Sequence, residues 1–287
     1  MSTRRNCRGP LALVFMVLTA AAFGLAATGN YLGQEPPGME PIRFAPSLLG
    51  GYAFSGTFNA DLTEFWFTKQ DPVGRVNHIE GYALVGGAWQ RVPTAPFAAV
   101  PNAMEPHIAP QGDRLFFTGV PAEGPTAYVS ERTETGWGRA IALPSPINAP
   151  GHLPMYFSST RDGTLYWTYL SNAGEAIVRT RKTEGGYGPV ERMASNGAAW
   201  VGAHPFVSPD ETLVIFDVRP NNAPGDLVAA FRRADGTWTT PQPIPAVNRA
   251  STDEMCASLS PDGRYLFFVR DLQIWWVDAA VLDRLRP

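Results

Sequence analysis

The fold is decided by the stretch Ser260-Pro261-Asp262-Gly263-Arg264-Tyr265-Leu266-Phe267-Phe268. Pro-Asp-Gly is a turn signal, because proline fixes φ, aspartate hydrogen-bonds its own backbone and glycine accepts a positive φ. The turn separates two short runs, Cys256 to Ser260 and Tyr265 to Val269, each long enough for one strand. The stretch therefore predicts a β-hairpin.

Four similar hairpins precede this one in the chain. The second strands of the five hairpins end in an aromatic residue, at Phe67, Phe117, Trp167, Phe216 and Phe268. The intervals between these aromatic residues are 50, 50, 49 and 52 residues. A period this regular indicates a repeat array, and about 50 residues suit one four-stranded propeller blade. The sequence thus predicts an all-β chain with a single β-propeller, built from five blades of four antiparallel strands.

Each unit has strands A and B in the hairpin, then strand C, a turn with glycine and an aromatic residue, and strand D. The fifth unit lacks strand D, because the chain after Val277 forms a helical turn. The segment Ile42 to Leu49 resembles the other D strands and has no strand C before it. Since proteins avoid exposed sheet edges, we expect this N-terminal segment to close the ring as the outer strand of the last blade.

Composition agrees with such a fold. The 287 residues are 45% hydrophobic and 17% charged, with 27 prolines and 28 glycines. Prolines and glycines spread along the chain suit many short strands and tight turns, and they disfavour long helices.

The first 29 residues predict a signal peptide. Arg4, Arg5 and Arg8 are followed by an apolar run from Leu11 to Ala27 and by small residues that offer cleavage sites. General secretion and the twin-arginine route both remain open, and an uncleaved membrane anchor is the alternative. We expect a linker over 30–40 and the propeller over 41–287, with the protein in the periplasm or outside the cell.

Charge and cysteine content exclude some functions. Loss of the three arginines takes the net charge from −3 to −6, so no basic surface for nucleic acid is expected. Only Cys256 remains after cleavage, and no internal disulfide can form. We expect a monomer with no cofactor, no metal, and no membrane contact other than an uncleaved signal.

The hairpin at 260–268 and the ending Ile274-Trp275-Trp276-Val277-Asp278 resemble the WD40-like (TolB-type) β-propeller repeat family. Ser208-Pro209-Asp210 matches the same pattern, and the segment 31–38 looks like the start of bacterial secreted members. The resemblance covers 31–287 and implies a periplasmic or secreted propeller. It implies the fold and not an activity, because the family includes scaffolds, partner-binding propellers and propellers attached to enzymes.

In such a meander, the A–B and C–D turns emerge at one end, which we call the turn face. The B–C and D–A connections emerge at the other, which we call the loop face, and function usually lies in irregular loops. Polar or aromatic residues at the start of the channel-lining A strands form the candidate binding site: Glu105, His107, His152, Trp200, His204 and Glu254, beside Asp253 and Cys256. The alternative is that a water-filled channel simply tolerates polar side chains.

Two functions remain open. The first is a non-catalytic exported scaffold that binds a protein or glycan partner. The second is a carbohydrate-active enzyme, a glycosidase or lyase, in which Glu105 and Glu254 supply the two carboxyl groups that such chemistry needs. Cys256 with His204 is the weaker candidate for a nucleophile, and Asp162, Asp210 and Asp262 are expected to form turns. We favour the non-catalytic scaffold.

Overall fold

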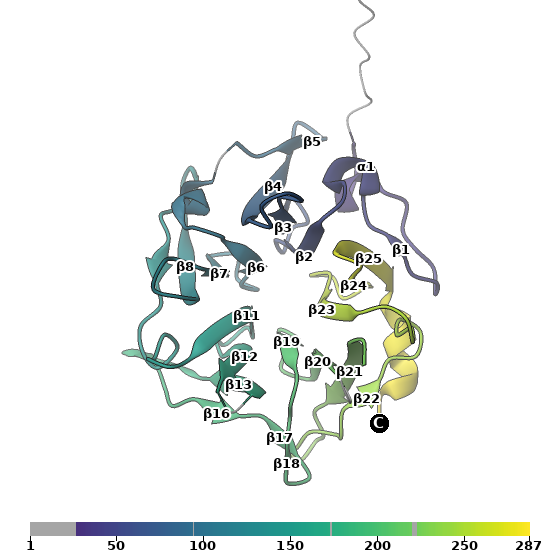
Figure 1. Cartoon of the computed structure of the whole chain (residues 1–287). Helices are drawn as coiled ribbons and strands as arrows, with labels where there is room; N and C mark the ends of the chain where they lie inside the picture. The colour runs from purple at the N-terminus through teal and green to yellow at the C-terminus, as the bar shows by residue number, and fades with distance from the viewer. Residues whose placement is uncertain (1–26, 94, 173, 220–222) are drawn as a thin grey trace, which may run out of the picture.

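A computed structural model describes residues 27–93, 95–172, 174–219 and 223–287. Five antiparallel sheets of four main strands stand around a central axis, and their innermost strands β2, β6, β11, β19 and β23 face it (Figure 1). The predicted all-β, five-bladed propeller is therefore confirmed. Among the described residues, no helix has the length and apolar character needed to cross a membrane.

The blades follow one another along the chain. Blade 1 contains β2 (Ala53–Phe58), β3 (Glu64–Gln70), β4 (Asn77–Val85) and β5 (Ala88–Arg91). Blade 2 contains β6 (Met104–Ile108), β7 (Arg114–Gly119), β8 (Thr126–Thr133), β9 (Gly136–Trp137) and β10 (Ile141–Ala142). Blade 3 contains β11 (Leu153–Ser159), β12 (Leu165–Ser171), β13 (Gly174–Thr180) and β16 (Glu191–Arg192). Blade 4 contains β19 (Ala203–Val207), β20 (Leu213–Val218), β21 (Asp226–Phe231) and β22 (Gln242–Pro243). Blade 5 contains β23 (Glu254–Leu259), β24 (Tyr265–Arg270), β25 (Gln273–Asp278) and β1 (Ile42–Arg43).

Short elements decorate this ring. Two extra hairpins belong to blade 3, namely β14 (Lys182–Thr183) with β15 (Gly186–Tyr187), and β17 (Ala194–Ser195) with β18 (Ala198–Ala199). The described helices are η1 (Tyr31–Gly33), α1 (Pro46–Leu49), η2 (Pro96–Ala99) and η4 (Ala279–Leu285).

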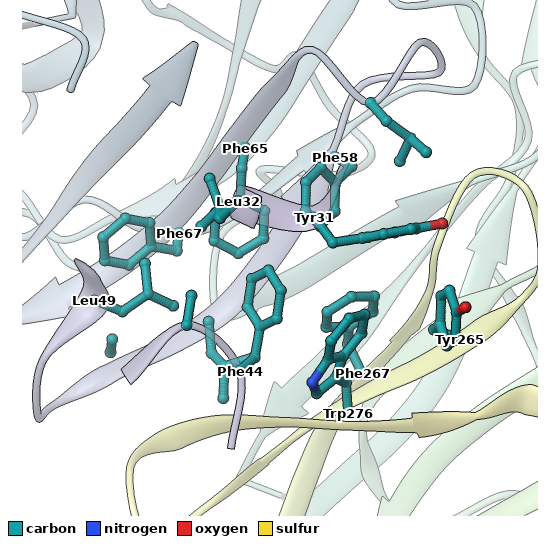
Figure 2. Close-up of a cluster of buried hydrophobic side chains, with 14 of the residues drawn as sticks. Tyr31, Leu32, Phe44, Leu49, Phe58, Phe65, Phe67, Tyr265, Phe267 and Trp276 are labelled. Carbon is teal, nitrogen blue, oxygen red and sulfur yellow. The ribbon is translucent and has the colours of Figure 1, made fainter. Parts of the chain in front are cut away.

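The N-terminal strand closes the ring, as predicted. β1 pairs with β25 in antiparallel register, with Ile42 opposite Trp276. The closing strand is shorter than the expected Ile42 to Leu49, because Ala45 adopts a left-handed φ of 40° and starts α1. Ile42 is 39% exposed, whereas Phe44 is 2% exposed and packs among aromatic rings of blades 1 and 5 (Figure 2).

The segment 30–40, expected as a linker, is packed at its start and mostly exposed further on. Tyr31 and Leu32 are buried in the same aromatic cluster as Phe44 (Figure 2). The Tyr31 hydroxyl donates a 2.6 Å hydrogen bond to Asp262 Oδ2, in the A–B turn of blade 5. The aromatic ring supplies apolar contact while its hydroxyl reaches a charged acceptor, so this segment contributes to closure. Most of the expected signal peptide, residues 1–26, lies outside the described residues.

Candidate functional site

All five innermost strands carry a β-bulge at the same place. The register with the neighbouring strand shifts once in each of them, between Met104 and His107 in β6 for example. One residue of each bulge has a positive φ between 50° and 61°: Ser55, Glu105, Tyr156, His204 and Cys256. Positive φ is uncommon for residues other than glycine, and bulges redirect side chains. The same backbone conformation is thus repeated at five equivalent positions along the channel.

Side chains of the neighbouring second strands satisfy the backbone of these bulges. Thr68 Oγ1 accepts from the Glu105 amide at 2.7 Å, and Thr168 Oγ1 accepts from the His204 amide at the same distance. Tyr156 is an exception, because its amide donates to Glu105 Oε2 at 2.9 Å. Each of these bonds joins one blade to the next, so the hydrogen bonds that stabilise the bulges also stabilise the contacts between blades.

The bulge side chains meet in a buried polar cluster. His204 Nδ1 lies 2.7 Å from Asp217 Oδ1, and His204 Nε2 lies 3.9 Å from Glu105 Oε1. Asp217 Oδ1 also accepts a 3.4 Å bond from the Cys256 amide, and the Tyr156 ring stands edge-on to the imidazole at 5.2 Å. We call Glu105, Tyr156, His204, Asp217 and Cys256 the channel cluster.

Electrostatics in the channel cluster favour a charged imidazole. Burial acts to lower the pKa of His204, but the carboxylate of Asp217 and the neighbouring Cys256 together outweigh burial and hold the pKa well above its usual range. Burial raises the pKa of Glu105, and the neighbouring His204 offsets only part of that rise. An imidazolium between two carboxyl groups compensates charge locally, as buried charges require.

A cavity of about 480 Å³ occupies the other end of the channel and opens on the turn face. The second halves of the innermost strands and the A–B turns form its wall. Its polar and charged lining residues include Thr57, His107, Ser159, Arg161, Asp210, Ser258, Asp262 and Arg286. None of the bulge residues with a positive φ lines this cavity.

The cavity wall is polar but carries balanced charge. His107 Nε2 lies 2.9 Å from Ser159 Oγ, and burial lowers the pKa of His107 to about 3, so its ring is neutral at physiological pH. Burial acts to raise the pKa of Asp210 and of Asp262. Hydrogen bonds from Ser208 and Thr212 to Asp210, and from Ser260 and Tyr31 to Asp262, help to outweigh burial, and both pKa values lie below the usual range. Both carboxylates are therefore ionised, and Arg161 and Arg286 line the same cavity.

The residues predicted from the sequence separate into three groups. Glu105 and His204 lie together with Cys256 in the channel cluster. The sequence analysis had placed all three at the start of channel-lining A strands. His107 lies beyond the bulge and lines the turn-face cavity instead.

The remaining predicted residues have structural partners. Glu254 is fully buried, and its Oε1 accepts from Arg270 Nε at 2.6 Å and from Thr252 at 2.6 Å. Trp200 is buried between blades 3 and 4, with its indole NH bonded to Ser195. His152 packs against Tyr169, with ring centroids 4.4 Å apart and the ring planes tilted by 49°. The expectation that Glu254 offers a free carboxylate at the channel mouth is wrong, because Arg270 neutralises it.

Tyr156, Asp217 and Ser55 were missed by sequence analysis. Ser55 and Tyr156 stand at the same place in their repeats as Glu105, and Asp217 directly follows the repeated aromatic residue Phe216. Extending the 50-residue period to single polar positions would have found all three. Among the described residues, no group of three or more histidine, cysteine, aspartate or glutamate side chains could hold a metal ion.

Comparisons with known proteins identify the fold. No protein-family model and no curated protein matches the chain. A putative TolB from Agrobacterium tumefaciens has a TM-score of 0.52 and 15% identity, covering 77% of this chain and 70% of that chain. A chain of a nidogen/laminin complex has a TM-score of 0.52 and 11% identity, covering 80% of this chain and 77% of that chain.

An enzyme is among the similar structures as well. A GH43_1 enzyme from Xanthomonas citri, complexed with xylotriose, has a TM-score of 0.51 and 14% identity, covering 80% of this chain and 87% of that chain. At such low identity the similarity shows a shared propeller fold, and a fold of this kind carries many functions. The function has to be inferred from the residues of this chain.

Proposed function

We propose that the chain is a non-catalytic, exported binding propeller, and that its ligand enters the cavity on the turn face. The cavity itself carries the proposal, since about 480 Å³ is in the usual range for a binding pocket. The ligand is an uncharged polar segment of a protein or of a glycan. We further propose that the protein acts as a monomer in the periplasm or outside the cell.

The lining of the cavity supports an uncharged ligand. The lining holds two arginines, Arg161 and Arg286, and two aspartates, Asp210 and Asp262, and the ring of His107 is neutral. Arg286 also lies 3.2 Å from Asp283, so the lining carries no net positive charge. Hydroxyl groups alternate with apolar side chains along the same wall. A charged ligand would give up its hydration without gaining a net opposite charge, whereas hydroxyl and amide groups find partners.

The positions of the carboxyl groups support binding over glycosidase chemistry. A glycosidase needs two carboxyl groups at one ligand, one of them protonated by a raised pKa. The cavity carboxylates Asp210 and Asp262 have lowered pKa values and serve their own turns. Glu105 has a raised pKa but lies in the channel cluster, and Glu254 is paired with Arg270.

Two matched variants test which face binds the ligand. Ala60 is exposed in the A–B turn of blade 1 and lines the cavity, whereas Val201 is 68% exposed before β19 on the loop face. Wild type, Ala60→Trp and Val201→Trp are each screened on a glycan array and against a phage-displayed peptide library. We expect ligands selected by wild type to be retained by Val201→Trp and lost by Ala60→Trp.

The opposite pattern would place the binding site on the loop face and overturn the proposal. A screen in which wild type selects nothing would also count against it. Turnover of any glycan on the array by wild type, followed by mass spectrometry of the products, would favour the enzyme instead.

A further inference from the structure

Two smaller cavities continue from the turn-face cavity towards the rim of the ring, between blades 2 and 3. The inner one, of about 180 Å³, shares Ala109, Ser159 and Arg161 with the wall of the turn-face cavity. The outer one, of about 280 Å³, shares four lining residues with the inner one: Arg114, Phe116, Lys182 and Tyr187. We call the inner and outer cavities together the blade 2–3 groove. The turn-face cavity and this groove therefore adjoin in a row from the channel to the rim.

The blade 2–3 groove opens where the repeat departs from its own pattern. The turn between strands C and D carries a tryptophan in blades 1, 2 and 4, and Trp89, Trp137 and Trp238 are each 6% exposed. Blade 3 has Tyr187 at this position, and its smaller ring is only half-buried against the core between blades 2 and 3. Because protein interiors are closely packed, the volume that an indole fills elsewhere is left open here.

The interface between blades 1 and 2 shows what closes such a groove. Glu64 of blade 1 accepts hydrogen bonds from Arg132 Nη1 at 2.6 Å and from the indole NH of Trp137 at 3.2 Å. The equivalent positions between blades 2 and 3 are Arg114, Lys182 and Tyr187. A cation thus stands where the carboxylate joined the two blades, and the ion pair that closes the first interface cannot form in the second.

The blade 2–3 groove combines buried apolar lining with charged lining. Phe116, Val129 and Leu143 of blade 2 line it and are buried. Its charged lining residues carry both signs and include Arg114, Glu131, Arg161, Lys182 and Glu184. Within the described parts of the chain, Lys182 and Glu184 take part in no ion pair. The groove therefore offers apolar contact together with single charges of either sign.

Polar groups are available where the turn-face cavity meets the groove. Gln111 Nε2 donates to the carbonyl of Arg161, which joins the A–B turns of blades 2 and 3, and both residues are exposed. An exposed hydrogen bond of this kind contributes little net stability, because water satisfies both groups when it breaks. The amide and the carbonyl can therefore exchange this bond for bonds to a peptide group of a ligand.

Building on the proposed function, we propose that the ligand is an extended polypeptide segment. It enters the turn-face cavity and continues through the blade 2–3 groove to the rim. Successive side chains of an extended chain point in opposite directions, so one set can contact the apolar lining while the other reaches the charged groups. A glycan would bury hydroxyl groups against Phe116, Val129 and Leu143 without hydrogen-bond partners, which costs free energy.

Linear peptides selected on wild type from a phage library of random dodecapeptides are the probes, and isothermal titration calorimetry measures their binding. Glu131→Trp obstructs the groove, because Glu131 is exposed and lines its outer cavity. Arg181→Trp is the matched control, since Arg181 is exposed at the equivalent position of blade 3 and lines neither the groove nor the turn-face cavity. Thermal melting of each variant shows that it is folded.

We expect Glu131→Trp and Ala60→Trp each to weaken binding of the dodecapeptides at least tenfold, and Arg181→Trp to bind them as wild type does. Peptides shortened from the end that lies in the groove should bind wild type and Glu131→Trp equally.

Three other results would overturn the proposal. Dodecapeptides that are lost by Ala60→Trp but retained by Glu131→Trp would leave the turn-face site standing and remove the groove from it. Dodecapeptides that are lost by Glu131→Trp but retained by Ala60→Trp would show a groove site apart from the turn-face cavity. Selection of glycans on the array, with no peptide selected from the library, would contradict a polypeptide ligand.

Discussion

Replacement of Phe44 by alanine tests how the ring is closed. The Phe44 ring is 2% exposed, and its centre lies 5.0 to 6.0 Å from the rings of Phe58, Phe65, Phe267 and Trp276. Truncation of a buried phenylalanine to alanine costs about 3–5 kcal/mol, and lost aromatic pairs add to the cost. We expect a loss of about 4–5 kcal/mol, out of the roughly 5–15 kcal/mol that stabilise a typical domain.

A matched control lies on the same closing strand. Ile42 pairs with Trp276 through the backbone, but its side chain is 39% exposed, so Ile42→Ala should cost about 1 kcal/mol or less. Thermal melting followed by circular dichroism should then show a fall of roughly 8–20 °C for Phe44→Ala and a few degrees for Ile42→Ala. Equal shifts for the two variants would refute the reasoning, because backbone pairing alone would then close the ring.

Two further predictions rest on the structure and one on the sequence. Glu254→Gln leaves Arg270 buried without its charged partner, and urea unfolding should show a loss of about 3–5 kcal/mol. Asp253→Asn changes a half-exposed neighbour and should cost below about 1 kcal/mol. Similar costs for the two variants would contradict a stabilising buried ion pair. In the folded protein the pKa of His107 is lowered from its usual value of 6.5 to about 3. The contribution of the neutral imidazole to stability is therefore fully present above pH 6.5 and is lost as the pH falls towards 3. At pH 5 the free energy of unfolding of wild type should be lower by roughly 1–2 kcal/mol, and His107→Gln should not show this decrease. If the variant and wild type lose the same stability between pH 6.5 and pH 5, the lowered pKa of His107 is refuted. If the protein is exported, mass spectrometry of material from its host should find an N-terminus between Ala26 and Tyr31, and an intact Met1 on a soluble protein would contradict export.

The repeat was predictable because its signals are local. Pro-Asp-Gly turns and aromatic strands return at a fixed period, and the missing D strand of the last unit pointed to closure by the N-terminus. Closure by Ile42–Arg43 confirms that inference. Burial of Tyr31 was not predictable, because its partner Asp262 is 231 residues away.

The candidate site was predicted less well, and the β-bulges are the reason. Without a bulge, the hairpin register that pairs Leu259 with Leu266 would place Glu254 opposite Asp271. The bulge shifts the register by one residue and places Glu254 opposite Arg270. Since a shift of one residue moves every following side chain, no alternation of polar and apolar residues could have revealed this ion pair.

The bulge in β6 also separated a glutamate and a histidine that the sequence placed together. Regular alternation puts Glu105 and His107 side by side at the channel mouth, but the shift between Met104 and His107 divides them. Glu105 joins the channel cluster and His107 faces the turn-face cavity. If Glu105 and His204 were exposed, Glu105→Gln and His204→Ala would change stability little. Both variants should instead lower stability, because Glu105 is 4% exposed and His204 is partnered by Asp217.

Hydrogen–deuterium exchange of wild type, with and without a ligand selected on the arrays, tests the central claim most directly. A ligand in the turn-face cavity should slow exchange in the A–B turns that surround it, over residues 109–112, 208–212 and 260–263. Backbone amides at the loop face, at the starts of β6, β19 and β23, should exchange as they do without ligand. Slower exchange at those strand starts, with unchanged A–B turns, would contradict a binding site on the turn face.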